Sequence, residues 1–314
     1  MVMAFGRAVA ALVALFAASV PADEITVRYG DSKGVERALL TAAGELNEIP
    51  YRVEWVEFPA TAPALEALAA GAIDLRGSAS APLIFAVAAG APIKVISTVH
   101  YDSAREAVAI LVLPGSPLHT AADLRGARIA TNKGSVGHHL VLAVLRKQQI
   151  PLAQVSIQYL LPSDAKAALI GGSVDAWSTW DPYTSLSEVQ DHLRPVATGA
   201  GVLDVDGDIV ASLQALTAKR RQVKDFVLRL DRAEQWGRAH QDDYAQLLSQ
   251  QTGLSFEAAR LVARHRLGRY LPIDDAAVRE HQEVADLYLQ AGVIHQRVDV
   301  SGAFDRSVLS DAIH

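Results

Sequence analysis

The chain has 314 residues, of which 50% are hydrophobic and 20% are charged, and its formal net charge is −6. This length is enough for two domains, and the acidic balance excludes the broad basic surface that is typical of nucleic-acid-binding proteins. The sequence contains no cysteine, which excludes disulfide bonds, thiolate metal sites and a cysteine nucleophile.

The first 22 residues are laid out like a secretory signal peptide. Arg7 is their only charged residue, residues 8–20 are almost all apolar, and small residues precede the first acidic pair at Asp23. The apolar run is shorter than the ~20 residues that span a membrane. We therefore expect residues 1–22 to be removed on export. Without a cysteine to carry a lipid anchor, the mature protein is expected to be soluble in the periplasm.

From residue 24 to residue 102 the sequence alternates between strand and helix patterns. Residues 51–58 alternate apolar and polar side chains with a period of two, as a half-buried strand does. Strands separated by helices usually form parallel sheets, so this part predicts a mainly parallel α/β sheet. The predicted strands are 25–28, 51–58, 73–76 and 93–99, and the predicted helices are 35–43, 62–70 and 81–89.

The middle of the chain begins with a continuous apolar strand at residues 107–113, which is expected to be fully buried. A second α/β set follows, and residues 209–215 are a candidate return crossing. From residue 218 onward the pattern is largely helical. The predicted strands of the second set are 128–131, 155–160 and 173–177. The predicted helices from there to the end are 120–124, 138–149, 163–170, 183–190, 219–240, 242–251, 255–267 and 274–291.

One motif occurs in both halves of the chain. Residues 65–82 and 166–182 each read as a short helix ended by glycine, then an apolar strand that contains an aspartate, then a small polar loop. The repeat predicts two similar α/β lobes with a ligand cleft between them. One lobe is expected to combine residues 23–105 and 211–314, and the other to span 106–210. Two crossings between lobes usually form a hinge, so we expect the lobes to close around a ligand.

Four loops share one design, because each follows a predicted strand, is small and polar, and precedes a helix. Ligands bind beyond the carboxyl ends of strands in α/β sheets, and helix N-termini favour oxyanions. The alternative for each loop is ordinary helix capping. The loops are Asp31-Ser32-Lys33-Gly34, Gly77-Ser78-Ala79-Ser80, Gly134-Ser135-Val136-Gly137-His138 and Ser178-Thr179-Trp180-Asp181.

Two tryptophans flank the last of these loops. Trp177 alternates with its strand and is expected in the core, whereas Trp180 is either an aromatic wall for the ligand or another packing residue. Asp181 precedes Pro182 and either caps a helix or holds a loop donor. Lys33 and Arg76 are basic residues in or beside the loops, and each either pairs with a ligand anion or is solvated.

The histidines do not predict a metal site. His138 and His139 are neighbours on a predicted helix and therefore point in different directions, so His138 is interpreted as a donor at a helix start. We expect His240, His265 and His281 in the helical C-terminal part to lie on the surface.

Residues 25–300 resemble the periplasmic binding proteins of aliphatic sulfonate importers, within the wider nitrate, sulfonate and taurine family. The most specific match is Val-Asp-Ala-Trp-Ser-Thr-Trp-Asp-Pro-Tyr at residues 174–183. The other matching stretches are Gly-Asp-Ser-Lys-Gly (30–34), Val-Glu-Trp-Val-Glu-Phe-Pro-Ala (53–60), Ala-Leu-Glu-Ala-Leu-Ala-Ala-Gly-Ala-Ile-Asp (64–74), Ala-Ala-Gly-Ala-Pro-Ile-Lys (88–94), Asp-Leu-Arg-Gly-Ala-Arg-Ile-Ala (123–130) and Lys-Gly-Ser-Val-Gly-His (133–138).

The resemblance implies a type II periplasmic binding fold and delivery of the ligand to an ABC permease and its ATPase. It also implies a monomer without catalysis, cofactor or metal. In this family the sulfonate head is held by loop amides and hydroxyls, and the organic tail lies against the cleft wall. The ligand-binding residues carried over by position are Ser32, Lys33, Ser80, Gly134, Ser135, His138, Trp180 and Asp181.

The chain departs from the family pattern at two of these positions. Ala79-Ser80 stands where the family usually has Gly-Asp, and Ser32 stands where it usually has Gln. Loss of a cleft acid favours a different tail or a more strongly anionic ligand. The alternatives are a binding protein for taurine, nitrate, a sulfate ester or a thiamin precursor, a sensory module, and an enzyme similar to thiamin-pyrimidine synthases. The enzyme would need a Cys and His metal set, and this chain has no Cys.

Overall fold

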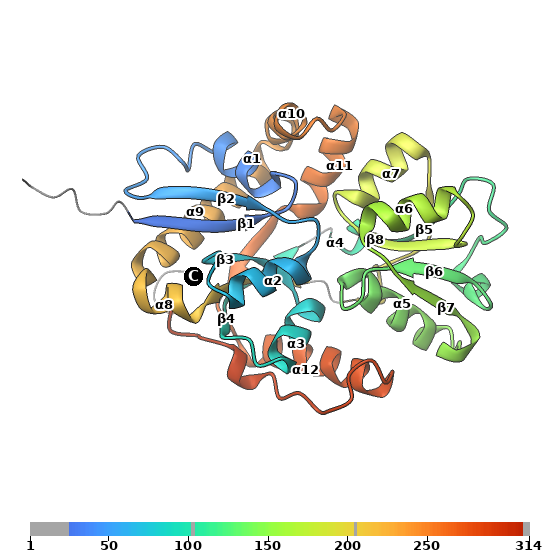
Figure 1. Ribbon diagram of the computed structural model, residues 1–314. Helices are drawn as coiled ribbons and strands as arrows, with labels where there is room; N and C mark the ends of the chain where they lie inside the picture. The colour runs from blue at the N-terminus through green and yellow to red at the C-terminus, as the bar shows by residue number, and fades with distance from the viewer. Residues whose placement is uncertain (1–24, 102–103, 204–205, 310–314) are drawn as a thin grey trace, which may run out of the picture.

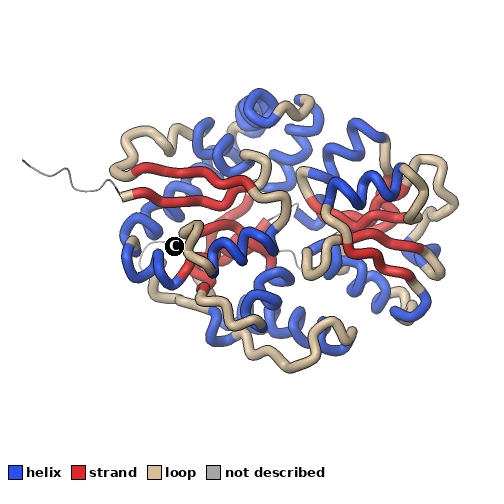
Figure 2. The backbone as a smooth tube through the Cα atoms, in the orientation of Figure 1, coloured by secondary structure: helices blue, strands red, loops and turns tan. Residues whose placement is uncertain are grey.

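The computed structural model describes residues 25–101, 104–203 and 206–309, and the predicted signal peptide at residues 1–22 lies outside these ranges. The chain forms two α/β lobes that lie side by side (Figures 1 and 2). We call the part built from residues 25–101 and 206–309 lobe one, and the part built from residues 104–203 lobe two.

Lobe one contains a six-stranded sheet in the order β11-β4-β10-β3-β1-β2. Its strands are β1 (Thr26–Asp31), β2 (Arg52–Glu57), β3 (Leu75–Ala79), β4 (Ile93–Tyr101), β10 (Asp206–Ser212) and β11 (Gly268–Leu271). Lobe two contains a five-stranded sheet in the order β7-β6-β8-β5-β9. Its strands are β5 (Val108–Val112), β6 (Arg128–Thr131), β7 (Ser156–Tyr159), β8 (Ala176–Trp180) and β9 (Arg194–Thr198).

Helices cover both sheets, and most of them begin or end within two residues of their predicted bounds. The helices of lobe one are α1 (Val35–Ala42), α2 (Thr61–Ala69), α3 (Ser80–Ala88), α8 (Leu213–Ala218), α9 (Arg220–Ala239), α10 (Gln241–Thr252), α11 (Phe256–Arg266) and α12 (Asp275–Gln290). The helices of lobe two are α4 (Ala104–Ala107), α5 (Val136–Lys147), α6 (Pro162–Ile170) and α7 (Tyr183–Asp191), with short 3-10 turns at Ala121–Leu124 and Leu152–Gln154.

The four strands of residues 25–101 run in one direction, as the mainly parallel prediction for this segment required, whereas both complete sheets are mixed. The pairs β1–β2, β1–β3, β6–β7 and β6–β8 are parallel, as βαβ units require. The strands β10 and β5 pair antiparallel to both of their neighbours. They are the strands through which the chain enters each sheet from the other lobe. The predicted return crossing at 209–215 therefore lies largely within β10, between β3 and β4. The exact lobe boundaries and the hinge motion remain predictions.

The sequence repeat has a counterpart in the contacts of the two lobes. In lobe one, Asp74 accepts the backbone N–H of Arg28 at 2.8 Å and its guanidinium at 3.0 Å. In lobe two, Asp175 accepts the backbone N–H of Arg128 at 2.8 Å and its guanidinium at 2.7 Å. Each aspartate thus ties the strand that ends its repeat to the first parallel strand of the same sheet.

Each sheet has hydrophobic clusters on its two faces, and a further cluster joins the lobes. This joining cluster combines Ile84 of α3 and Tyr288 of α12, from lobe one, with Leu142 of α5, from lobe two. The Tyr288 hydroxyl also donates to the carbonyl of Ser135 at 3.3 Å. Helix α12 therefore connects the lobes along one side of the molecule (Figure 1).

Two further observations bear on function. Within the described ranges, no helix has the length and hydrophobicity that a membrane span requires. The same residues contain no group of three or more His, Cys, Asp or Glu side chains that could hold a metal ion.

Candidate ligand-binding site

A cavity of about 130 Å³ lies between the two lobes, and we call it the cleft cavity. Its lining comes from strands, loops and helix ends of both lobes. Lobe one contributes Ser32, Glu36, Ala60, Thr61, Arg76, Gly77, Ser78, Ala79, Pro82, Tyr101, Gly207, His265 and Arg266. Lobe two contributes Ala107, Val108, Ser135, Val136, Trp180 and Asp181.

Five helices begin at or beside this cavity, and three of them are capped by the chain's own side chains. Asp31 accepts the amides of Ser32, Glu36 and Arg37 at 2.6 to 3.3 Å, at the start of α1. The Ser135 hydroxyl accepts the amide of His138 at 3.1 Å in α5. Asp181 performs the same role for α7, as described below.

The remaining two helices have alanine at the N-cap. Ala60 precedes α2 and Ala79 precedes α3, both in extended conformation and without a side-chain capping bond. The first N–H groups of a helix have no intrahelical partner, and they carry the positive end of the helix dipole. The starts of α2 and α3 thus offer uncapped donors on the lobe-one side of the cleft cavity.

Lobe one places several charged side chains at the cavity. Arg266 of α11 forms an ion pair with Glu36 of α1. Burial alone would raise the pKa of Glu36, but the charges of Arg266 and Arg76 and the hydrogen bond with Asp31 together outweigh it, and the pKa is lowered. Burial and the neighbouring Glu36 raise the pKa of Asp31 well above its usual range. The charges of Glu36 and Arg266 therefore compensate each other.

Arg76, at the second position of β3, has no such partner. Its side chain is buried, with 6% exposure, and its Nε donates to the carbonyl of Gly77 at 2.6 Å. Its Nη1 has no hydrogen-bond partner, and no carboxylate of the described ranges forms an ion pair with it. Burial lowers the pKa of Arg76, but a guanidinium keeps its proton at neutral pH.

Lobe two closes the other side of the cavity through Asp181 and Trp180. Asp181 is 4% exposed and accepts from the amide and hydroxyl of Ser185 at 2.9 and 2.8 Å. Its second oxygen lies 2.7 Å from Nδ1 of His265 in lobe one. Trp180 packs edge-on against Tyr183, whose hydroxyl donates to the lobe-one carbonyl of Pro59 at 2.9 Å. These contacts bridge the lobes beside the cavity.

Three comparisons place the chain among known proteins. A family model described as NMT1/THI5 like matches residues 52–244. The protein named "Putative aliphatic sulfonates-binding protein" of Escherichia coli K12 is 30% identical over 292 residues, which are 92% of this chain and 91% of that protein.

The chain belongs to the NMT1/THI5-like family. Among solved structures it resembles the alkanesulfonate-binding protein SsuA from Xanthomonas axonopodis pv. citri bound to MOPS, with 33% identity and a TM-score of 0.83. That match covers 91% of this chain and all of the other. The periplasmic aliphatic sulphonate binding protein SsuA from Escherichia coli is 31% identical, with a TM-score of 0.77 and coverage of 88% and 91%. The predicted fold class, a type II periplasmic binding fold with two α/β lobes, is thereby confirmed.

In this NMT1/THI5-like chain, the predicted site residues divide into two groups. Ser32, Ser135, Trp180 and Asp181 line the cleft cavity. The other four do not line it: Lys33, Ser80, Gly134 and His138. The ligand-binding role of all eight residues remains a prediction.

Each residue of the second group has a different surrounding. Lys33 lies in a separate surface hollow, with its ammonium 5.4 Å from the ring of Tyr183. The amide of Gly134 donates to Nδ1 of His138 at 3.2 Å, so these two residues bond to each other. His138 is fully buried, and burial together with Lys133 lowers its pKa to about 4, which keeps it neutral.

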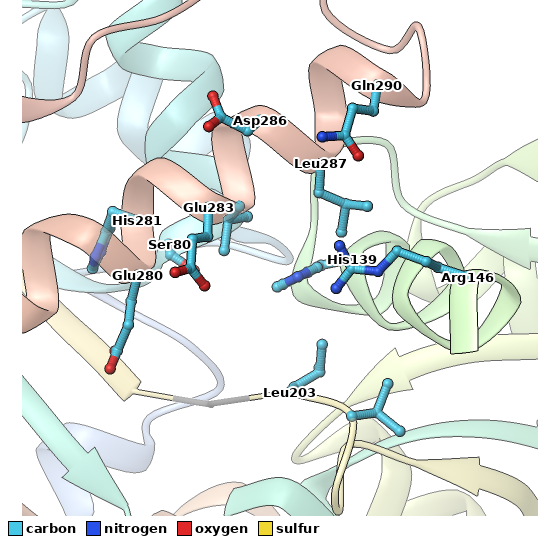
Figure 3. Close-up of a pocket in the computed structure, with 12 residues that line it drawn as sticks. Ser80, His139, Arg146, Leu203, Glu280, His281, Glu283, Asp286, Leu287 and Gln290 are labelled. Atoms are coloured by element: carbon cyan, nitrogen blue, oxygen red, sulfur yellow. The ribbon is translucent and has the colours of Figure 1, made fainter.

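Ser80 lines a second groove of about 340 Å³, between α12 of lobe one and α5 of lobe two. Figure 3 shows Leu287 of α12 pointing toward Arg146 and His139 of α5, whereas the Asp286 carboxylate points away from them. Ser80, which stands where the family pattern usually has an acid, is thus placed at this groove.

Two other expectations about the site were wrong. The loops at residues 77–80 and 178–181 are mostly strand, because β3 continues to Ala79 and β8 to Trp180. His265 and His281 are buried rather than exposed, at 3% each. His265 pairs with Asp181, and His281 Nε2 lies 2.8 Å from Asp208.

Sequence reasoning did not identify Glu36, Arg266 or His265 as cavity residues. Glu36 and Arg266 are 230 positions apart in sequence, and nothing local in either segment indicates the pair. The only available signal was that His265 and Arg266 sit at the end of a predicted helix whose place in the fold was unknown.

Proposed function

We propose that this protein is the periplasmic substrate-binding component of an ABC importer and that it binds an organosulfonate anion in the cleft cavity. The observation that carries the proposal is the convergence of two uncapped helix starts from lobe one and the aromatic side chain of Trp180 from lobe two on one interlobe cavity. Helix N-termini favour oxyanions, and a sulfonate is permanently ionised near neutral pH. Trp180 supplies an apolar wall for the organic tail.

The relatives support a binding role rather than a catalytic one. The matched proteins of Escherichia coli and Xanthomonas are named as binding proteins for aliphatic sulfonates or alkanesulfonates. We therefore propose that residues 1–22 are a cleaved signal peptide, that the mature protein is a periplasmic monomer, and that it delivers its ligand to a permease and its ATPase.

A thermal-shift screen of the mature protein tests this proposal. The panel contains methane-, butane- and octanesulfonate, MOPS, taurine, nitrate, sulfate and a thiamin pyrimidine precursor, with butyrate and butanol as matched non-sulfonates. A ligand at a hundredfold excess over its Kd stabilises the folded state by about 2.7 kcal/mol, which shifts the midpoint by several degrees. We expect shifts with sulfonates and none with butanol. A shift with nitrate or the precursor alone would contradict the sulfonate assignment.

A further inference from the structure

The polar side chains that lobe two places at the cleft cavity are largely engaged within the protein. The Ser135 hydroxyl donates to the carbonyl of Asn132 at 2.7 Å and accepts the amide of His138. Asp181 has both oxygens occupied by Ser185 and His265. The Ser135 hydroxyl would therefore have to give up its bond to Asn132 in order to donate to an incoming acidic group, and the Asp181 carboxylate has no proton to donate to one.

The donors of lobe one are arranged in the opposite way. Ala60 and Ala79 have no side-chain oxygen for the first amides of α2 and α3. Pro63 and Pro82 occupy the third position of each helix, so each helix start presents the amides of its first two residues. Both alanines line the cavity.

Arg76 is an independent observation at the same place. A buried charge is normally paired, because its desolvation is otherwise uncompensated. Arg76 lines the cavity with only 6% of its surface exposed, and its Nη1 has no hydrogen-bond partner. The nearby carboxylates Glu36 and Asp181 are already paired with Arg266 and His265. Arg76 therefore lines the cleft cavity with no ion-pair partner among the described residues and with an unsatisfied donor at Nη1.

We propose that Arg76 binds the acidic group of the ligand in lobe one, together with the uncapped amides at the starts of α2 and α3. This assignment rests on the proposed function and names the residue that selects the ligand's charge. The three oxygens of a sulfonate or sulfate-ester group accept the guanidinium and the two pairs of amides, and the tail then extends toward Trp180 of lobe two. A neutral analogue of the same shape would leave the Arg76 guanidinium unpaired and would therefore not bind in the cleft cavity.

The test measures the Kd of the mature protein by titration calorimetry, with butanesulfonate, octanesulfonate and MOPS as probes. Arg76→Gln removes the charge and should weaken binding at least thirtyfold. Arg76→Lys keeps the charge but not the planar guanidinium, and should weaken binding three- to tenfold. Arg146→Gln, in the groove between α5 and α12, is the matched control and should bind within twofold of the wild type.

A second variant keeps the proposal testable if Arg76→Gln does not fold. Ala79→Asp places a carboxylate at the N-cap of α3, where it caps the free amides and neutralises Arg76. It should fold with equal or higher stability and bind sulfonates at least tenfold more weakly, whereas the neutral cap Ala79→Ser should lose less affinity. Unliganded Arg76→Gln should likewise be no less stable than the wild type in urea, because a purely structural arginine would lower stability when removed.

The outcomes separate this inference from the proposed function. If the wild type binds none of the sulfonates, the proposed function is wrong. If the wild type binds and either Arg76→Gln or Ala79→Asp keeps the wild-type Kd, the function stands and Arg76 does not hold the acidic group. A loss in Arg146→Gln as large as that in Arg76→Gln would move the acidic group to the other groove and overturn the assignment.

Discussion

Asp74 and Asp175 occupy equivalent places in the two halves of the repeat, so exchanging each for asparagine compares one contact in two environments. Asp74 is 2% exposed and accepts from both Arg28 and Lys219, at 3.0 and 2.8 Å. Asp175 is 37% exposed and pairs with Arg128 alone. We expect Asp74→Asn to destabilise the protein by roughly 3 kcal/mol, because breaking a buried pair leaves its partners uncompensated. Asp175→Asn should cost about 1 kcal/mol or less, as exposed pairs do.

The same contrast predicts a pH dependence. Burial alone would raise the pKa of Asp74, but the hydrogen bonds from Arg28 and Lys219 outweigh it and lower the pKa. A carboxyl with a lowered folded pKa stabilises the fold at every pH above its unfolded pKa of ~3.9. That stability is lost as the pH falls through the folded value. The difference between wild type and Asp74→Asn should therefore be constant from pH 5 to pH 8.

Urea unfolding followed by circular dichroism at pH 7 measures both variants. Equal urea slopes in wild type and variants are needed for the comparison, because a changed slope indicates a changed unfolding reaction. If each lobe unfolds in its own transition, the loss should appear in the transition of the lobe that carries the substitution. A loss for Asp175→Asn as large as that for Asp74→Asn would refute the reasoning that burial determines the energy of this contact.

Two further predictions concern lobe two. Burial lowers the pKa of both His138 and His139 to about 4. Between pH 6.5 and pH 4 the unfolded chain therefore binds more protons than the folded protein does. Acidification across this range should lower the free energy of unfolding by up to roughly 3 kcal/mol per histidine. Urea midpoints of wild type and His139→Gln measure this, and parallel pH profiles would contradict it. Gly134→Ala should destabilise the protein by more than the ~1 kcal/mol of left-handed strain, because the added Cβ would lie 2.9 Å from the ring of Phe85. Gly172→Ala is the control, because Gly172 has the same φ of +72 with open space around it. Equal thermal midpoints for the two variants would rule out the contact with Phe85.

The sequence predicted those elements whose pattern is local. Helices such as α9 and α12 have long amphipathic faces, and the buried strand β5 is a continuous apolar run, so their bounds agree closely with the prediction. The strands β9 and β11 were missed. They are five and four residues long, and they form because β5 and β4, respectively, offer them an edge to pair with. A short strand that depends on pairing with a distant strand has no recognisable pattern of apolar and polar residues of its own.

The same distinction explains the candidate site. Ser32, Ser135 and Asp181 could be identified because a small polar residue between a strand and a helix is a local signal. Glu36 and His265 reach the cleft cavity only through pairing with residues far away in sequence. Arg76 was noticed as a basic residue beside a loop. Its burial and its lack of an ion-pair partner depend on how β3 sits in the complete fold.

Most residues that line the cleft cavity lie outside the hydrophobic clusters that stabilise each lobe. Ser32, Thr61 and Ser78 can therefore be exchanged without opening a void in either interior. Specificity and foldability are thus encoded in largely separate positions. The lining of the cleft cavity can therefore change by single substitutions while the packing that holds each lobe together stays the same.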